Sequence, residues 1–285
     1  MKIVFSKRCL EFGRLGHPES AQRLERCFDL LKSRDFKFVE AISCLEEDIL
    51  LVHTKELLKA VRENNFYDPD TPNLENIFEY AKLSAGATLL ASQFAQEEGF
   101  AFSLMRPPGH HAGRSSLGGF CYFNNIAISV EKIRKTKKKI AIIDFDCHHG
   151  NGTEDIFKGK ACVCYLSLHQ SPFYPGTGLE SHDNCFNFPL AAGTGESEYL
   201  AVFKQGLEKI KDFRPDILAV SAGFDTYRRD PLGNIKLDKT TYRKIGELIA
   251  AFGKPTFAVL EGGYSKDLAY CVSEFLSGMT ALKKL

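Results

Sequence analysis

Apolar and polar positions alternate along this chain in a way that is typical of a parallel α/β protein. Short apolar runs rich in Val, Ile and Phe are separated by amphipathic segments of roughly ten to twenty residues. Such runs suit strands that are buried on both faces of a sheet, and the segments between them suit helices that cover it. The pattern predicts one α/β domain over residues 1–285, with a central, mainly parallel sheet and helices on both faces. The expected strands are 2–5, 100–104, 140–145, 162–168, 216–221 and 255–260, and the expected helices are 18–33, 54–63, 74–97, 124–136, 196–212, 239–252 and 266–282.

Polar, glycine-rich segments directly follow five of the predicted strands. In an open α/β sheet, ligands bind at the carboxyl ends of the strands, so we expect these segments to converge on one active site. Because they are spread over much of the sequence, their convergence also favours a single domain. The segments are MRPPGHHAG (105–113), DFDCHHGNG (144–152), HQSPFYPGTG (169–178), SAGFDTYRRDPLG (221–233) and EGGYSKD (261–267).

The charge and cysteine content argue against several classes of protein. Lys and Arg number 37 and Asp and Glu 36, so no global field favours nucleic acid or an anionic membrane as a direct partner. The basic run KIRKTKKK (132–139) is interpreted as the solvated end of a helix, or alternatively as a docking patch for an acidic partner. The nine cysteines form no C-x-x-C pair, and no segment approaches the length of about eighteen apolar residues that a membrane span needs. We expect reduced cysteines, no signal peptide and a cytoplasmic location, and nothing in the sequence indicates an oligomeric state.

Two carboxylates and an imidazole are crowded together at the end of the predicted strand 140–145. Residues two apart in an extended chain point to the same side, so Asp144, Asp146 and His148 can project together if the backbone stays extended beyond the strand. Asp225 follows another predicted strand and can complete a set of two Asp and one His. A catalytic zinc ion takes three such ligands and keeps one position open for water. The alternative for the D-x-D-x-H segment alone is a charged surface turn.

The histidines outside this segment form one adjacent pair and a set of isolated residues. His110 and His111 follow a rigid Pro-Pro-Gly turn, and metal-assisted hydrolysis needs a group of near-neutral pKa that takes and returns a proton. His53 lies in an amphipathic stretch and His182 in a polar loop, so we predict surface or capping roles for both. His17 and His169 carry no comparable signal.

Seven segments, taken in order along the chain, resemble the zinc-dependent histone deacetylase family of the arginase/deacetylase fold. They are most similar to its class II branch and to bacterial histone deacetylase-like amidohydrolases. The resemblance implies zinc-dependent hydrolysis of the amide of N-ε-acyl-lysine in a protein or peptide partner. It extends from HPESAQR (17–23) to LEGGY (260–264), and the segments are RPPGHHAG, GGFCYFNN, DFDCHHGNGTEDIF, YLSLH, PGTG, SAGFDTYRRDPLG and LEGGY.

The resemblance also implies a role for each matching residue of the site. His111 would act as general base and then as general acid, and His110 would act mainly through its charge. Tyr264 would donate its hydroxyl to the substrate carbonyl oxygen as that oxygen becomes an oxyanion. The ligands of a single zinc ion would be Asp146, His148 and Asp225.

Further residues would orient this machinery. Asp144 would orient His110, and Asn151 would orient His111. Class I relatives carry Asp at the position of Asn151; because a neutral amide does not favour a charged imidazole, we predict a lower working pKa for His111. By the same resemblance, a structural potassium ion would be enclosed by Asp144, Asp146, His148, Ser167 and Leu168.

The resemblance implies a substrate tunnel as well. Phe120 and Tyr174, with Gly119 beside them, match its aromatic walls, although without the resemblance they would be interpreted as ordinary core residues. Asp70 matches approximately the residue that grips the substrate backbone amide. Arg23 matches an arginine behind the metal that steers acetate, and a buried structural ion pair is the competing interpretation.

One position bears on the choice of substrate. Polyamine deacetylases of this family carry Glu where this chain has Leu232, and a carboxylate there would attract a second ammonium group. Leucine favours acyl-lysine over acetylpolyamines. Three alternatives stay open: an acetylpolyamine amidohydrolase of the same fold, an arginase-like manganese enzyme, and a non-catalytic acetyl-lysine binder. Zinc and ferrous iron both suit the ligand set, and the preferred acyl chain length is open.

Overall fold

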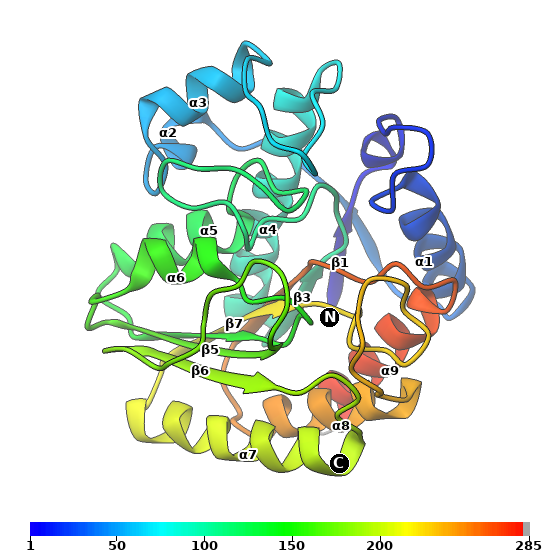
Figure 1. The fold of residues 1–285 in the computed structure, drawn as a ribbon, viewed down its shortest axis with the longest axis vertical. Helices are drawn as coiled ribbons and strands as arrows, with labels where there is room; N and C mark the ends of the chain where they lie inside the picture. The colour runs from blue at the N-terminus through cyan, green and yellow to red at the C-terminus, as the bar shows by residue number, and fades with distance from the viewer. Residues whose placement is uncertain (282–285) are drawn as a thin grey trace.

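The computed structural model describes residues 1–281, and in that range one sheet of eight strands forms the centre of the molecule (Figure 1). The strand order is β2-β1-β3-β8-β7-β4-β5-β6, and every neighbouring pair is parallel. The central strands are buried at every position, as their continuous apolar runs predicted. The strands are β1 (Lys2–Phe5), β2 (Phe38–Glu40), β3 (Phe100–Ser103), β4 (Ile140–Asp144), β5 (Val163–Gln170), β6 (Cys185–Leu190), β7 (Ile217–Ala222) and β8 (Thr256–Leu260).

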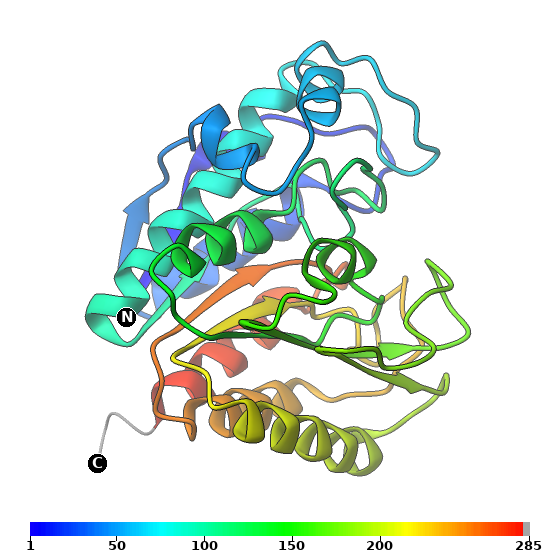
Figure 2. The ribbon, with the colours of Figure 1, turned by 90° about the vertical axis from the view of Figure 1, so that its left-hand side faces the viewer.

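Helices cover both faces of this sheet. Figure 1 and Figure 2 show α4, α5 and α6 on one face, and α1, α7, α8 and α9 on the other. The resulting three layers form the single α/β domain that the sequence predicted. The helical segments are η1 (Lys7–Leu10, a 3₁₀ turn), α1 (Ala21–Ser33), α2 (Glu46–Ile49), α3 (Lys55–Arg62), α4 (Ile77–Glu98), α5 (Asn125–Arg134), α6 (Asn151–Phe157), α7 (Glu196–Phe213), α8 (Lys239–Ala250) and α9 (Leu268–Ala281).

All six strands expected from the sequence are present, and the elements missing from the prediction are short or lie at the sheet edges. The unpredicted strands β2 and β6 are the two edge strands, where partial exposure interrupts the apolar run, and β6 contains Pro189, which an edge strand tolerates. The segments η1 and α2 have four residues each, too few to show helical periodicity. Helix α6 was missed because its first residues, Asn151 and Gly152, belong to a glycine-rich run that indicates a loop.

Several predicted helix boundaries differ from the structure by two or three residues, as in α4, which begins at Ile77 rather than at residue 74. Helix α1 begins at Ala21 rather than at residue 18, because its N-cap residue is Ser20 and Pro18 lies before it. Helix α5 ends at Arg134, so most of the basic run 135–139 forms the turn that leads into β4. Residue 282, the expected end of the last helix, lies outside the described residues.

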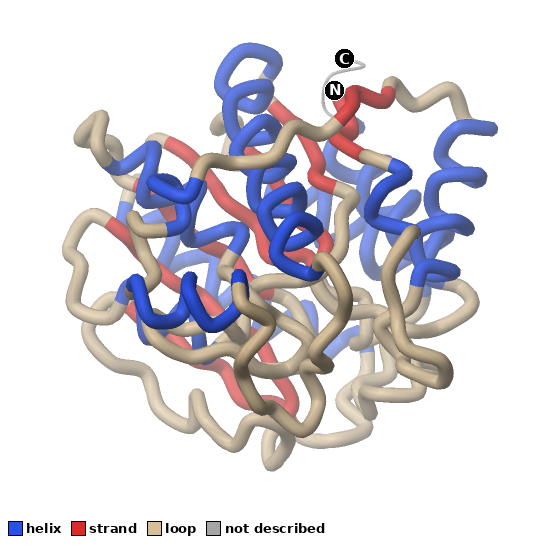
Figure 3. Tube along the Cα trace, turned by 90° about the horizontal axis from the view of Figure 1, so that it is seen from above, coloured by secondary structure: helices blue, strands red, loops and turns tan. Residues whose placement is uncertain are grey.

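The long loops lie at the carboxyl ends of the strands. Figure 3 shows them gathered on one side of the molecule, away from the N-terminus. All nine cysteines are free, as predicted, and only Cys162 is not fully buried. Among residues 1–281 no helix is both long and apolar enough to cross a membrane.

Candidate metal centre and active site

Two carboxylates and one imidazole converge at the carboxyl ends of β4 and β7. The ligand atoms of Asp146, His148 and Asp225 all lie within 4.8 Å of one another. His148 Nδ1 is 3.0 Å from Asp146 Oδ1 and 3.0 Å from Asp225 Oδ2. Burial would lower the pKa of His148, but the two carboxylates outweigh burial and raise this pKa to about 10. The set therefore demands positive charge, and its donor atoms suit one zinc ion or a similar divalent metal ion.

Two glycines allow the loops that carry these residues to approach closely. A Cβ atom on Gly223, directly after β7, would lie 2.2 Å from Asp146 Oδ2. A Cβ atom on Gly262, in the loop after β8, would lie 2.3 Å from Asp225 Oδ2. Neither position can hold a side chain without displacing a carboxylate of the metal site. The glycines of the SAGFD and LEGGY segments are thus required by the distances within the site.

The adjacent histidines lie beside the metal site, and one contacts a carboxylate while the other contacts a neutral amide. His110 Nδ1 is 3.1 Å from Asp144 Oδ2, and His111 Nδ1 is 2.7 Å from Asn151 Oδ1. Burial acts against the charge of His110, but Asp146 and Asp144 raise its pKa to about 10. Burial and the nearby His110 hold the pKa of His111 well below its ordinary value. A pair of groups with pKa values pushed apart is the usual arrangement for an electrostatic partner and a base.

These residues form the inner end of a cavity of about 250 Å³. A Cβ atom on Gly119 would lie 2.4 Å from the His111 ring, so a glycine is needed where this wall meets the base. Burial raises the pKa of Tyr264 well above its ordinary value, so its hydroxyl keeps a proton to donate. The residues around the cavity are Asp70, Pro108, His110, His111, Gly119, Phe120, Asp146, His148, Phe173, Tyr174, Leu232, Gly262 and Tyr264.

The structure thus brings five of the six predicted substrate residues to the cavity, and Arg23 is the exception. The guanidinium group of Arg23 lies behind Tyr264, 4.6 Å from its ring centroid, and donates to the carbonyls of Gly263 at 2.6 Å and Glu261 at 2.7 Å. It also forms an ion pair with Glu19, which in turn pairs with the buried Arg106. These contacts match the competing interpretation of Arg23 as part of a buried ion-pair network.

Three of the five residues expected around potassium lie in neighbouring strands, and the other two, Asp146 and His148, lie in the loop that follows β4. Asp144, the last residue of β4, pairs with Ser167 of β5, and Leu168 follows Ser167. The Asp144 carboxylate accepts hydrogen bonds from the N–H of Asp146 at 3.2 Å and from the hydroxyl of Tyr165 at 3.0 Å. Asp144 thus has partners in its own loop as well as in His110.

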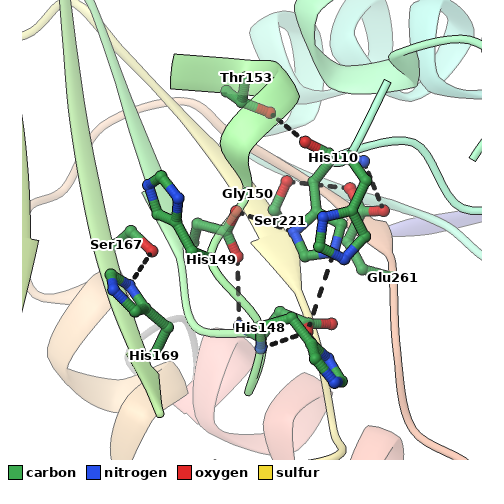
Figure 4. Close-up of polar contacts among 12 residues, drawn as sticks. His110, His148, His149, Gly150, Thr153, Ser167, His169, Ser221 and Glu261 are labelled. Atoms are coloured by element: carbon green, nitrogen blue, oxygen red, sulfur yellow. Dashed lines mark hydrogen bonds and ion pairs between the residues drawn. The ribbon is translucent and has the colours of Figure 1, made fainter. Parts of the chain in front are cut away.

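Two contributors to the site were not singled out from the sequence. Phe173 stacks on His148, with ring centroids 5.1 Å apart and an interplanar angle of 20°. Glu261 is fully buried, and its carboxylate accepts the N–H groups of Gly109 at 2.7 Å and of His110 at 3.2 Å (Figure 4). Both residues stand inside the quoted segments PFYPGTG and LEGGY. The available signals were that Phe173 is the apolar neighbour of Tyr174 and that Glu261 is a lone carboxylate directly after a buried strand.

Of the surface or capping role predicted for His53, the surface part is wrong, whereas the ring does bond the residue that caps a helix. His53 is 4% exposed; its Nε2 accepts the N–H of Asn124, the N-cap of α5, and its Nδ1 donates to the carbonyl of Gly113. The amphipathic pattern around it did not reveal that the loop 106–124 covers this residue. His182 is exposed, as predicted.

The geometry agrees with comparisons to known proteins. A model of the histone deacetylase domain matches residues 17–279. This chain belongs to the histone deacetylase family. A probable deacetylase of the family from Methanothermobacter thermautotrophicus is 41% identical over 271 residues, which cover 88% of this chain and 82% of that protein.

Other members of the histone deacetylase family that resemble the chain are named for polyamine substrates. Acetylpolyamine amidohydrolase 1 of Pseudomonas aeruginosa is 36% identical over 213 residues, which cover 70% of this chain and 62% of that protein. The crystal structure of an acetylpolyamine aminohydrolase from Burkholderia pseudomallei superposes with a TM-score of 0.94 at 26% identity and covers 99% of both chains. The fold and the general activity, that of a deacetylase or amidohydrolase, are therefore as the sequence predicted.

Proposed function

We propose that this chain is a zinc-dependent lysine deacylase that hydrolyses the amide of N-ε-acyl-lysine in peptides or proteins. The observation that carries the proposal is the position of the three-residue metal set beside two adjacent histidines, one of which is oriented by a carboxylate and the other by a neutral amide. The cavity around them has aromatic walls that suit an aliphatic lysine stem.

The residues of the chain divide the chemistry between them. A zinc ion held by Asp146, His148 and Asp225 would supply Lewis acidity and an activated water. His111 is neutral and oriented by Asn151, so its free nitrogen can take a proton and later return it to the leaving amine. His110 is oriented by the carboxylate of Asp144, 3.1 Å from its Nδ1, which favours a charged ring at this position.

Tyr264 completes this division of roles. Its protonated hydroxyl serves the carbonyl oxygen of the substrate as negative charge develops there. A donor that meets charge only in the transition state speeds the reaction rather than tightening ground-state binding. The presence of this donor with all three ligand residues favours catalysis over a binding role without activity.

The mouth of the cavity bears on the choice of substrate. Leu232 forms part of the wall and offers no negative charge to a second ammonium group, which favours acyl-lysine. The second candidate substrate is an acetylpolyamine, which the names of two relatives suggest. In its favour, Asp70 lines the cavity and Asp68 lies two residues before it in the same loop. Coulombic attraction to these carboxylates could replace the missing gatekeeper.

The structural potassium ion is part of the proposal. The pairing of Asp144 with Ser167 across β4 and β5 supports a cation site at the position that the family resemblance implies. Potassium there would brace the segment that carries the metal ligands. We expect a higher unfolding temperature in potassium chloride than in sodium chloride at equal ionic strength, and equal temperatures would contradict this part of the proposal.

The deciding experiment compares turnover of the zinc-loaded chain on an acetyl-lysine peptide, N-acetylputrescine and acetylspermidine. Preference for the peptide supports the lysine deacylase, and preference for the polyamines replaces it with the second candidate. Tyr264→Phe is the control, because it removes only the hydroxyl that serves the oxyanion. Absence of turnover on every substrate, including longer acyl-lysine peptides, would contradict the enzymatic proposal.

A further inference from the structure

The carboxylate of Asp230 joins two loops of the site through three backbone hydrogen bonds. Its Oδ1 accepts the N–H of Leu232 at 3.0 Å, and its Oδ2 accepts those of Tyr264 at 2.6 Å and Ser265 at 3.0 Å. Asp230 is 7% exposed and lies between β7 and α8, in the segment that also carries Asp225. One side chain thus connects the loop of a metal ligand with the loop of the oxyanion donor.

The segment that holds Tyr264 depends on such outside partners. It lies between β8 and α9 and has no regular structure of its own. Gly262 donates its N–H to Asp146 Oδ2 at 2.8 Å, and the carbonyl of Gly263 accepts from Arg23 at 2.6 Å. The next two N–H groups, those of Tyr264 and Ser265, are the ones that Asp230 accepts. Without that carboxylate, two N–H groups in a half-buried segment would lose their acceptor.

The side chain of Tyr264 is held far less firmly than its backbone. Its ring lies against Phe120, at a centroid distance of 5.9 Å, and against the guanidinium group of Arg23. Both are face or edge contacts, which hold a ring less rigidly than a hydrogen bond does, and within residues 1–281 its hydroxyl makes no hydrogen bond. The place of the hydroxyl in the cavity therefore follows the backbone, and Asp230 fixes that backbone.

We propose that Asp230 is a positioning residue that sets where the Tyr264 hydroxyl meets the substrate oxygen. The inference rests on the proposed function, in which Tyr264 serves the oxyanion. An oxyanion donor acts only when it lies within about 2.7–3.1 Å of the developing charge, so a small shift of the loop removes much of its effect. Asp230 itself does not line the cavity, and its effect is on the rate rather than on substrate binding.

A double-mutant cycle tests this coupling. Asp230→Asn keeps the size of the side chain but replaces one acceptor oxygen with a donor, so it cannot accept all three N–H groups. We expect kcat to fall about 10- to 100-fold with little change in KM, the range usual for loss of a residue that orients a catalytic group. In the Tyr264→Phe background the same substitution should change kcat far less, because the hydroxyl that it misplaces is already absent. Equal effects in the two backgrounds, or an unchanged kcat in the single variant, would overturn the proposal.

Asp267→Asn is the matched control. Asp267 lies three residues after Tyr264, and its carboxylate bonds the Tyr227 hydroxyl and Lys239 rather than the Tyr264 backbone. The same loss of charge in the same segment should leave kcat unchanged. A comparable fall in kcat for Asp267→Asn would assign the effect to general loosening of the segment and count against Asp230.

Amide hydrogen exchange of a peptide that covers 262–266 supplies a readout that does not depend on activity. In the wild-type protein the N–H groups of Tyr264 and Ser265 should exchange more slowly than in a free peptide, and Asp230→Ala, which offers no acceptor oxygen, should remove that protection. Exchange of the wild-type amides at the free-peptide rate would overturn the inference. If the wild-type protein hydrolyses no acylated amine, the proposed function fails, and exchange still decides whether Asp230 holds the Tyr264 backbone.

Discussion

The inner end of the cavity and its mouth are built in opposite ways. At the inner end, carboxylates are buried and multiply bonded: Asp225 Oδ1 accepts the N–H of Cys147 at 2.7 Å while its Oδ2 faces His148. At the mouth, the carboxylate of Asp70 is exposed and makes no hydrogen bond within the described chain, and Tyr174 is 43% exposed. Each of these carboxylate groups at the inner end has several contacts, so packing and hydrogen bonds fix the positions of the side chains there. A few exposed side chains can change specificity at the mouth without disturbing that chemistry.

Removal of a metal ligand should have the largest effect. Asp225→Asn weakens a charged donor at the centre of the inner network, so we expect loss of bound zinc and of all measurable turnover. Metal analysis after gel filtration and a peptide deacylation assay would check this. Asp183→Asn, at an exposed turn, is the control and should keep both properties. A zinc-free Asp225→Asn variant with wild-type turnover would contradict the metal role.

The orienting amide of the inner end should control the pH dependence. Asn151→Asp places a negative charge 2.7 Å from His111 Nδ1, which favours the protonated ring and raises its pKa, by about 1–3 units for such a pair. The base is active when neutral, so activity falls as pH drops through this pKa. The acidic limb of the kcat/KM profile should therefore move to higher pH. An unmoved acidic limb would contradict the assignment of His111 as the base.

The buried ring of His53, which bonds the loop 106–124, should make the free energy of unfolding depend on pH. Burial lowers the pKa of His53 to about 4, although the hydrogen bond to the carbonyl of Gly113 acts in the opposite direction. Between pH 6.5 and about 4 the unfolded chain binds a proton that the folded chain refuses, so stability falls as pH drops through this window, by up to about 3 kcal/mol.

Urea unfolding at several pH values would measure this loss. His53→Gln offers the same donor and acceptor without a titratable ring, so its stability should fall less over the same window than that of the wild type. Identical pH slopes for the two proteins would show that His53 is not responsible.

Changes at the mouth should have the smallest effect on rate and should act on selectivity. Leu232→Glu adds a half-exposed carboxylate, and exposed ion pairs contribute about 0.2–1 kcal/mol, so we expect a few-fold gain in kcat/KM for acetylspermidine relative to an acetyl-lysine peptide. The gain should shrink as salt concentration rises. Leu232→Gln is the neutral control of similar shape. Equal selectivity in the Glu and Gln variants would show that charge at this position does not cause the change in selectivity.

Sequence reasoning succeeded where a local pattern is sufficient. A few consecutive residues are enough to recognise the strand 140–145, the D-x-D-x-H segment at its end, and Asp225 after the strand 216–221. Because these two strands are parallel neighbours, their carboxyl ends lie together. The sequence does not reveal why positions 119, 223 and 262 hold glycine. The Cβ distances to His111, Asp146 and Asp225 explain why nothing larger fits at these positions.

Partners that are distant in sequence could not be predicted in this way. Asp230 contacts Tyr264 across 34 positions and Glu261 contacts His110 across 151, and no periodicity encodes such pairs. The burial of His53 was missed because the amphipathic pattern reports on the adjacent helix and not on the loop that covers this residue. The edge strands β2 and β6 depend on pairing with a neighbouring strand rather than on a strong β-strand propensity of their own residues.

The sequence by itself determined the fold class, the residues able to hold a metal ion and the pair of histidines beside them, because strand burial and short motifs are local properties. Only the tertiary structure showed which histidine faces a carboxylate and which faces an amide, which carboxylate joins the two loops of the site, and that Arg23 lies in an ion-pair network behind the cavity. These properties depend on distances between loops that follow different strands, and electrostatic and hydrogen-bond energies change steeply over a few ångströms.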